Sequence, residues 1–115
     1  MAKRTNLMSL IAVLKERQKK TKSLKEDAFK EAKRLASLLR KYYKFEVFYL
    51  CGSLLSDKFR RHSDIDIVIK GLKFEDFFKA YAFLIKESKY KIDLKPFEDL
   101  TPDFKWREKD WIKIF

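Results

Sequence analysis

Two aspartates lie one residue apart in an apolar run, shortly after a Gly-Ser pair. Gly52-Ser53 is followed, after a short basic loop, by the segment that contains Asp64, Asp66 and Ile69. The alternation of this segment predicts a strand, in which residues i and i+2 point to the same face. Asp64 and Asp66 are therefore expected to project together, with their Cα atoms about 6.5 Å apart. Two unpaired carboxylates are costly to bury, so a metal ion, a basic cluster or open solvent must face them.

The elements around this pair follow from apolar periodicity and from capping signals. Ser23 and Glu26 have the spacing of a capping box and precede an apolar stripe, which predicts a helix over residues 24–43. Thr101-Pro102 is a typical helix start and predicts a last helix that ends near Asp110. The other predicted elements are strands over 45–51, 64–70 and 90–94 and a helix over 74–87, which carries an aromatic stripe typical of a core.

These elements predict an α/β fold in which helices cover a small mixed sheet. The loop between the first two strands is too short for a crossover helix, whereas the helix over 74–87 can connect the second strand to a parallel third strand. If the third strand lies beside the second, Asp93 joins Asp64 and Asp66 on one face. The 115 residues are expected to form a single domain.

The N-terminal segment, residues 1–22, is interpreted as a separate amphipathic element. Leu7, Ile11 and Leu14 match one face of a helix over residues 5–20, which either packs on the core or contacts a partner. A charged stretch follows and no cleavage site is present, which argues against a signal peptide. No apolar run is long enough to cross a membrane.

Composition narrows the class of partner and the compartment. The formal net charge is +11, which favours anionic partners such as nucleotides, nucleic acid or an acidic protein surface. Lysine-rich helix surfaces that are simply solvated give the same charge. Cys51 is the only cysteine and is expected to be a buried, inert thiol. The absence of paired cysteines fits a reducing compartment and predicts a cytoplasmic protein.

The order Gly52-Ser53, then Asp64 and Asp66, then a later strand with Asp93, resembles the nucleotidyltransferase superfamily of DNA polymerase beta. The size resembles its minimal members, the MNT proteins, over roughly residues 24–115. The resemblance implies a polymerase beta-like fold and transfer of AMP from ATP. It implies that Asp64 and Asp66 hold two Mg²⁺ ions, with Mn²⁺ as an alternative metal. It also implies that Asp93 completes one metal site or activates the acceptor hydroxyl.

The same resemblance suggests where the triphosphate binds. Gly52 allows close approach of the backbone to the phosphates, and the Ser53 hydroxyl could bind their oxygens. Many relatives carry an arginine soon after the Gly-Ser pair, and this chain does not. Lys58 and Arg61, with Arg60 between them, are the expected substitutes; a solvated basic loop is the alternative for these residues.

The resemblance also implies a partner and a role. MNT proteins commonly pair with a HEPN protein as antitoxin and toxin, and members transfer AMP onto a tyrosine of the HEPN partner. We therefore expect a protein adenylyltransferase that acts as an antitoxin. Two other hypotheses stay open at this point: an antitoxin that inhibits its partner by contact alone, and a basic protein that binds nucleic acid or adds nucleotides to it.

Overall fold

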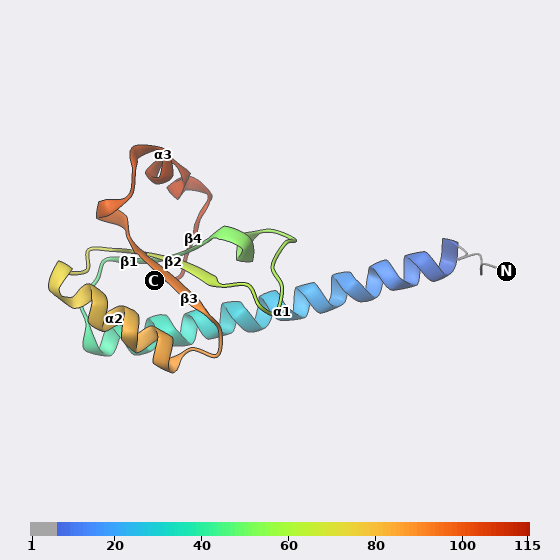
Figure 1. Ribbon diagram of the computed structural model, residues 1–115, viewed down its shortest axis with the longest axis horizontal. Helices are drawn as coiled ribbons and strands as arrows, with labels where there is room; N and C mark the ends of the chain where they lie inside the picture. Colours follow the sequence, from blue (N-terminus) through green and yellow to red (C-terminus); the bar gives the residue numbers. More distant parts are fainter. Residues whose placement is uncertain (1–6) are drawn as a thin grey trace.

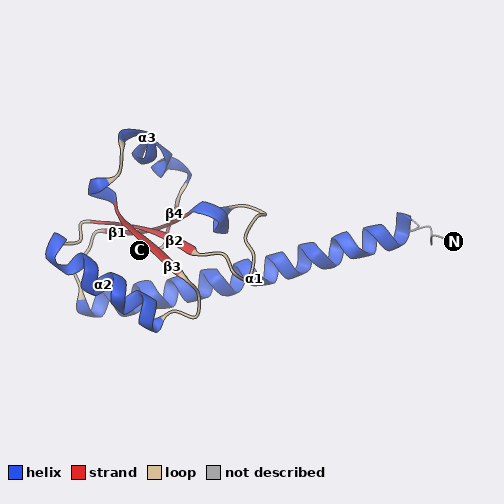
Figure 2. Ribbon diagram, in the orientation of Figure 1, coloured by secondary structure: helices blue, strands red, loops and turns tan. Residues whose placement is uncertain are grey.

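The computed structural model describes residues 7–115, which form a four-stranded mixed sheet with helices packed on it (Figures 1 and 2). The strand order is β3-β2-β1-β4. The helices are α1 (Leu7–Tyr42), α2 (Phe74–Glu87) and α3 (Pro102–Lys105), and the strands are β1 (Val47–Cys51), β2 (Ile65–Lys70), β3 (Ile92–Pro96) and β4 (Ile112–Lys113). This confirms the predicted small mixed sheet covered by helices.

The first helix differs from the prediction, because α1 is one uninterrupted helix of 36 residues. The two predicted helices, over 5–20 and 24–43, are wrong as separate elements, although positions 5 and 6 lie outside the described residues. Ser23 lies inside α1, so the predicted capping box is also wrong. The physical reason is that no glycine or proline occurs from Leu7 to Tyr42, and Lys, Leu, Ala and Glu all favour a helix.

Only the second half of α1 packs on the domain. The buried residues of this helix all lie between Ala28 and Leu39, and the first half extends away from the sheet into solvent (Figure 1). Large apolar side chains are exposed on that first half: Leu7, Met8, Leu10, Val13 and Leu14. The amphipathic N-terminal element is therefore not packed on the core. No helix among residues 7–115 is long and apolar enough to span a membrane.

The three central strands pair as the connection lengths predict. β1 and β2 are antiparallel, which a short connecting loop permits. β2 and β3 are parallel, with α2 as the crossover. The bounds of α2 agree with the predicted helix over 74–87. The helix α2 and the second half of α1 lie on the same side of the sheet (Figure 1).

The two faces of the sheet carry different kinds of residue. One face is apolar and packs against α1 and α2, with Phe48, Leu50, Ile65, Ile67, Ile69, Ile92 and Leu94 in the core. The opposite face carries the alternate residues, including Asp66 and Asp93, and it faces the C-terminal segment (Figure 2). The strand alternation therefore keeps both carboxylates out of the apolar core.

The C-terminal segment differs from the predicted helix over 101–110. Thr101 is the N-cap as predicted, with its hydroxyl accepting from Phe104 N. The α-helical part ends at Lys105, and a 3₁₀ segment continues from Trp106 to Asp110. The following strand β4 was not predicted and pairs with β1. Two residues are too short for a periodic signal, so their pairing depends on tertiary contacts.

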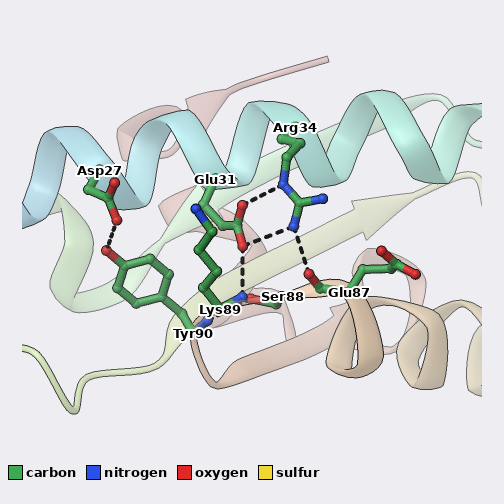
Figure 3. A network of polar contacts seen from close by, with 7 residues as sticks. All are labelled: Asp27, Glu31, Arg34, Glu87, Ser88, Lys89 and Tyr90. Carbon is green, nitrogen blue, oxygen red and sulfur yellow. Dashed lines mark hydrogen bonds and ion pairs between the residues drawn. The ribbon is translucent and has the colours of Figure 1, made fainter.

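A buried carboxylate joins α1 to the turn between α2 and β3 (Figure 3). Glu31 is 4% exposed; its carboxylate accepts from Arg34 Nε at 2.6 Å and from the backbone N of Lys89 at 2.7 Å. Arg34 Nη2 also donates to Glu87 O at 2.6 Å. Beside this group, the Tyr90 hydroxyl donates to Asp27. These contacts fix the start of β3, the strand that carries Asp93.

Candidate active site

The two strands β2 and β3 bring two of the predicted carboxylates together. Asp66 and Asp93 are partners in the parallel register, and each alternates with apolar residues that anchor its strand in the core. On the other side of β2, Asp66 is opposite Cys51 of β1. The sheet thus places Asp66 between the end of β1, where the Gly-Ser pair follows, and Asp93.

The electrostatics of this pair differ from those of surface aspartates. Burial raises the pKa of Asp66, and the nearby charge of Asp93 raises it further. Lys95, two residues after Asp93 on the same face of β3, forms an ion pair with Asp93 and opposes the rise in the pKa of Asp66. The sequence analysis did not single out Lys95, although its i+2 spacing from Asp93 was the available signal.

Gly52 lies tightly against the Asp66 side chain. Its φ is +72°, a conformation that residues with a side chain rarely adopt. A Cβ at this position would overlap with Oδ2 of Asp66. Glycine is therefore required twice, by the backbone conformation and by the close approach of the carboxylate. The backbone turns directly beside Asp66 and begins a 3₁₀ turn over Gly52–Leu55.

Cys51 has the predicted character. The thiol is buried and donates to the backbone O of Asp66 at 3.6 Å. Burial, with a smaller contribution from the charge of Asp66, raises the pKa of Cys51 to about 11. A thiol with this pKa is almost fully protonated at neutral pH, which argues against a nucleophilic role.

A cleft of about 360 Å³ opens above Asp66 and Gly52. Its floor comes from the strands, including Lys95. Its other wall comes from the C-terminal segment: Phe104, Arg107, Asp110 and Trp111. No local sequence pattern predicts this second wall, because the C-terminal segment reaches the strands only through contacts between residues that are distant in the sequence.

The family comparison decides what this arrangement is. The family described as Polymerase beta, Nucleotidyltransferase matches residues 33–110, which include the Gly-Ser turn, all three aspartates and the C-terminal wall of the cleft except Trp111. The chain belongs to this nucleotidyltransferase family. The family assignment made from Gly52-Ser53, Asp64, Asp66 and Asp93 is therefore confirmed.

A solved structure has the same nucleotidyltransferase fold. It is a crystal structure of a toxin-antitoxin with AMP-PNP, and it matches with a TM-score of 0.59 and 18% sequence identity over 72% of each chain. At this identity the similarity establishes the fold. No curated protein matches this chain.

Two of the predicted site residues, Gly52 and Asp66, line the cleft, whereas Asp93 and the remaining ones do not. Asp64 is exposed and directly precedes β2, and its charge contributes to the raised pKa of Asp66. Ser53 is half-buried inside the 3₁₀ turn. The N-cap of that turn is Cys51, so Ser53 does not cap it. Lys58 and Arg61 are exposed and do not line the cleft.

A divalent cation fits the chemistry of the carboxylate pair. Oxygen donors are what Mg²⁺ prefers. The pKa of Asp66 is raised by burial and then by the charge of Asp93, and a cation beside the carboxylate would favour its charged form. Within residues 7–115, however, no three His, Cys, Asp or Glu side chains are gathered as a metal-binding group. The ammonium group of Lys95 is the positive charge that neutralises Asp93 here. Metal ligation by Asp64, Asp66 and Asp93 stays a prediction.

A larger groove of about 690 Å³ lies elsewhere, between the middle of α1 and the loop that contains Asp57 and Arg60. Its walls include Arg17, Lys22 and Lys25 of α1, and none of the predicted catalytic aspartates lines it. Of these aspartates, Asp66 lines the smaller cleft.

Proposed function

We propose that this chain is a metal-dependent nucleotidyltransferase that transfers AMP from ATP to a hydroxyl of a partner protein. The observation that carries the proposal is the in-register pair Asp66 and Asp93, of which Asp66 lines the cleft together with Gly52. Two neighbouring carboxylates beside a glycine turn, where no side chain blocks the backbone, suit the binding of a metal-chelated triphosphate. Family membership supports this chemistry.

Each residue has a distinct part in the proposed reaction. Asp64, Asp66 and Asp93 would hold Mg²⁺, or Mn²⁺, which neutralises the charge of the phosphates and of the attacking oxygen. Gly52 and Ser53 follow β1 directly and bind the phosphates through the backbone and the hydroxyl. Asp93 would act on the acceptor hydroxyl, either by completing the metal site that lowers its pKa or by taking its proton. The α-phosphate then passes to that oxygen, and pyrophosphate leaves.

The choice of ATP and of a protein acceptor rests on two further observations. The structure with the same fold is a toxin-antitoxin with AMP-PNP, an ATP analogue. The exposed apolar residues on the first half of α1 form a surface suited to a protein partner. We therefore propose that this chain is the cytoplasmic antitoxin of a HEPN/MNT pair and that the HEPN toxin supplies the acceptor hydroxyl.

The experiment uses the chain purified together with the product of the neighbouring reading frame, which is tested as the proposed toxin. The complex is incubated with ATP labelled at the α-phosphate and with Mg²⁺, and the partner is analysed by mass spectrometry. We expect AMP on a hydroxyl side chain of the partner with the wild-type chain and none with Asp66→Asn. An Asp66→Asn chain that still silences the toxin would instead support an antitoxin that acts by contact alone.

The same reaction mixture distinguishes a nucleic-acid acceptor from a protein acceptor. RNA is added, and both RNA labelling and RNA binding are measured between low and high salt. Labelled RNA ends and steeply salt-dependent binding would replace the protein acceptor with nucleic acid. Label on the partner alone supports the proposed function.

A further inference from the structure

The basic loop does not bring a cation to the cleft in which the triphosphate is expected to bind. Lys58 and Arg61 do not line the cleft. The guanidinium of Arg60 donates to the backbone O of Asp57 at 2.7 Å and of Phe59 at 2.9 Å, so it stabilises its own loop. The cleft contains two cations of other origin, Lys95 and Arg107.

These two cations are not equivalent. Lys95 is engaged with Asp93, whereas Arg107 pairs with no carboxylate among the described residues. Arg107 is exposed, and its guanidinium lies over the Phe104 ring at 5.8 Å. The Arg107 guanidinium therefore keeps its hydrogen-bond donors available at the mouth of the cleft.

The residue after Arg107 fixes it at this position. Glu108 accepts a hydrogen bond from the Tyr49 hydroxyl of β1 and lies 3.8 Å from Lys70 Nζ of β2. Trp111 packs its ring on Tyr49, with the ring centroids 5.4 Å apart. The 3₁₀ segment is thus held to β1, which ends at the Gly52 turn, and to β2, which carries Asp66 near its start.

We propose that Arg107 binds the β- and γ-phosphate oxygens of the nucleotide and takes the place of the arginine that is missing after Gly52-Ser53. The inference rests on the proposed function of the cleft. A guanidinium binds phosphate oxygens in a bidentate manner and stays charged at all relevant pH values. Arg107 shares the cleft with Gly52, the point at which the backbone can approach the phosphates. The C-terminal segment therefore completes the nucleotide site from a part of the chain far from the Gly-Ser turn.

The test compares ligands that differ only in their phosphates. Binding of ATP, AMP and inorganic tripolyphosphate, each with Mg²⁺, is measured by titration calorimetry for the wild type, Arg107→Ala and Arg107→Lys. The matched control is Lys109→Ala, because Lys109 lies on the same segment, packs over Trp106 at 4.4 Å and does not line the cleft.

We expect Arg107→Ala to weaken the binding of ATP and of tripolyphosphate about tenfold to a hundredfold, because one or two charge-assisted hydrogen bonds are lost. AMP binding and the melting temperature should not change. Arg107→Lys should bind ATP with intermediate affinity, and Lys109→Ala should bind like the wild type.

Three outcomes would overturn the inference. If the wild type binds ATP and Arg107→Ala binds it equally well, Arg107 is a surface residue paired with Phe104, and the proposed function stands. If Arg107→Ala loses affinity equally for AMP and for ATP, Arg107 lies beside the nucleoside instead. A wild type that binds neither ATP nor tripolyphosphate would overturn the inference and the proposed function together.

Discussion

Asp66 of β2 and Asp93 of β3 lie opposite each other in parallel register, and Lys95 neutralises the second of them. Asp66 lines the cleft; burial and then the charge of Asp93 raise its pKa, and Lys95 opposes this rise. Such sites are typical of metal-dependent chemistry, because the cost of holding the charges is recovered when a cation binds.

The first prediction concerns the charge of Asp66. Its folded pKa is raised, so the folded state holds the proton more tightly than the unfolded state. Stability is then greatest below the ordinary aspartate pKa of about 4 and falls as pH rises through the raised value. At neutral pH without metal, Asp66→Asn should raise the melting temperature, because the amide carries no charge that burial and Asp93 disfavour. Thermal denaturation from pH 4 to pH 8 measures this.

The same variant also tests the metal site. Mg²⁺ with ATP should stabilise the wild type and leave Asp66→Asn unchanged, because the variant lacks the central ligand. Equal Mg²⁺-ATP affinity in calorimetry for the wild type and for the double variant Asp64→Asn, Asp66→Asn would contradict the assignment of both residues as ligands.

The second prediction separates chemistry from binding. Asp93→Asn should keep most of the nucleotide affinity, because Asp66 and the Gly52 turn remain. AMP transfer should fall by about two to four orders of magnitude, the usual loss for one acid-base or metal-ligand role. Single-turnover transfer and ATP titration on the same preparation give both values. A parallel loss of affinity and rate would place Asp93 in ground-state binding instead.

The third prediction concerns Gly52, with Gly71 as its control. Both glycines have positive φ, +72° and +80°, so alanine at either position should cost about 1–2 kcal/mol of stability. At Gly52 the added Cβ also meets the Asp66 carboxylate, whereas at Gly71 it meets the Glu46 side chain. Gly52→Ala should therefore abolish nucleotide binding, and Gly71→Ala should retain it. Chemical denaturation and ATP titration distinguish the two effects.

The fourth prediction concerns the buried Glu31, whose hydrogen bond from Arg34 lowers its pKa. Its contribution to stability is complete above the unfolded glutamate pKa of about 4.3 and is lost as pH falls through the lowered value. Glu31→Gln should cost about 1.5–3 kcal/mol at neutral pH, the range for hydrogen bonds to a charged group. Exposed Glu16→Gln is the control. Urea denaturation should show the difference between the two variants shrinking below about pH 4.

Much of the site was predictable because alternation and connection length are local signals. The apolar residues on both sides of Asp66 and Asp93 identify two strands, and the amphipathic α2 between them identifies a parallel crossover. A crossover through α2 places β3 parallel to β2, and in that arrangement the two aspartates are partners. The buried apolar face fixes which side the carboxylates occupy.

The parts that could not be predicted depend on long-range contacts. β4 pairs with β1 over only two residues, and the position of Arg107 follows from the contact of Glu108 with Tyr49. Nothing in the local sequence around Trp106–Asp110 indicates that it faces the Gly52 turn. The continuous α1 was missed for a different reason: a capping box at Ser23 and Glu26 is only a local preference, and without a helix-breaking residue the helix continues through it.

The last prediction concerns Ser53, which follows the tight Gly52 turn. Its backbone O accepts from the backbone N and the hydroxyl of Ser56, each at 3.0 Å, while no hydrogen bond of the Ser53 hydroxyl is found within residues 7–115. A hydroxyl without a structural partner beside the carboxylates suits a phosphate contact. Ser53→Ala should weaken ATP binding about threefold to tenfold, the loss of one hydrogen bond of about 1 kcal/mol.

The melting temperature of Ser53→Ala should equal that of the wild type, because the variant removes no contact within the described fold. Ser56→Ala is the control with the opposite expectation: it removes the hydrogen bond to Ser53 O and should lower the melting temperature, while the hydroxyl of Ser53 remains for ATP. If Ser53→Ala binds ATP like the wild type, the phosphates must be held by the Gly52 backbone and by Arg107 without the serine.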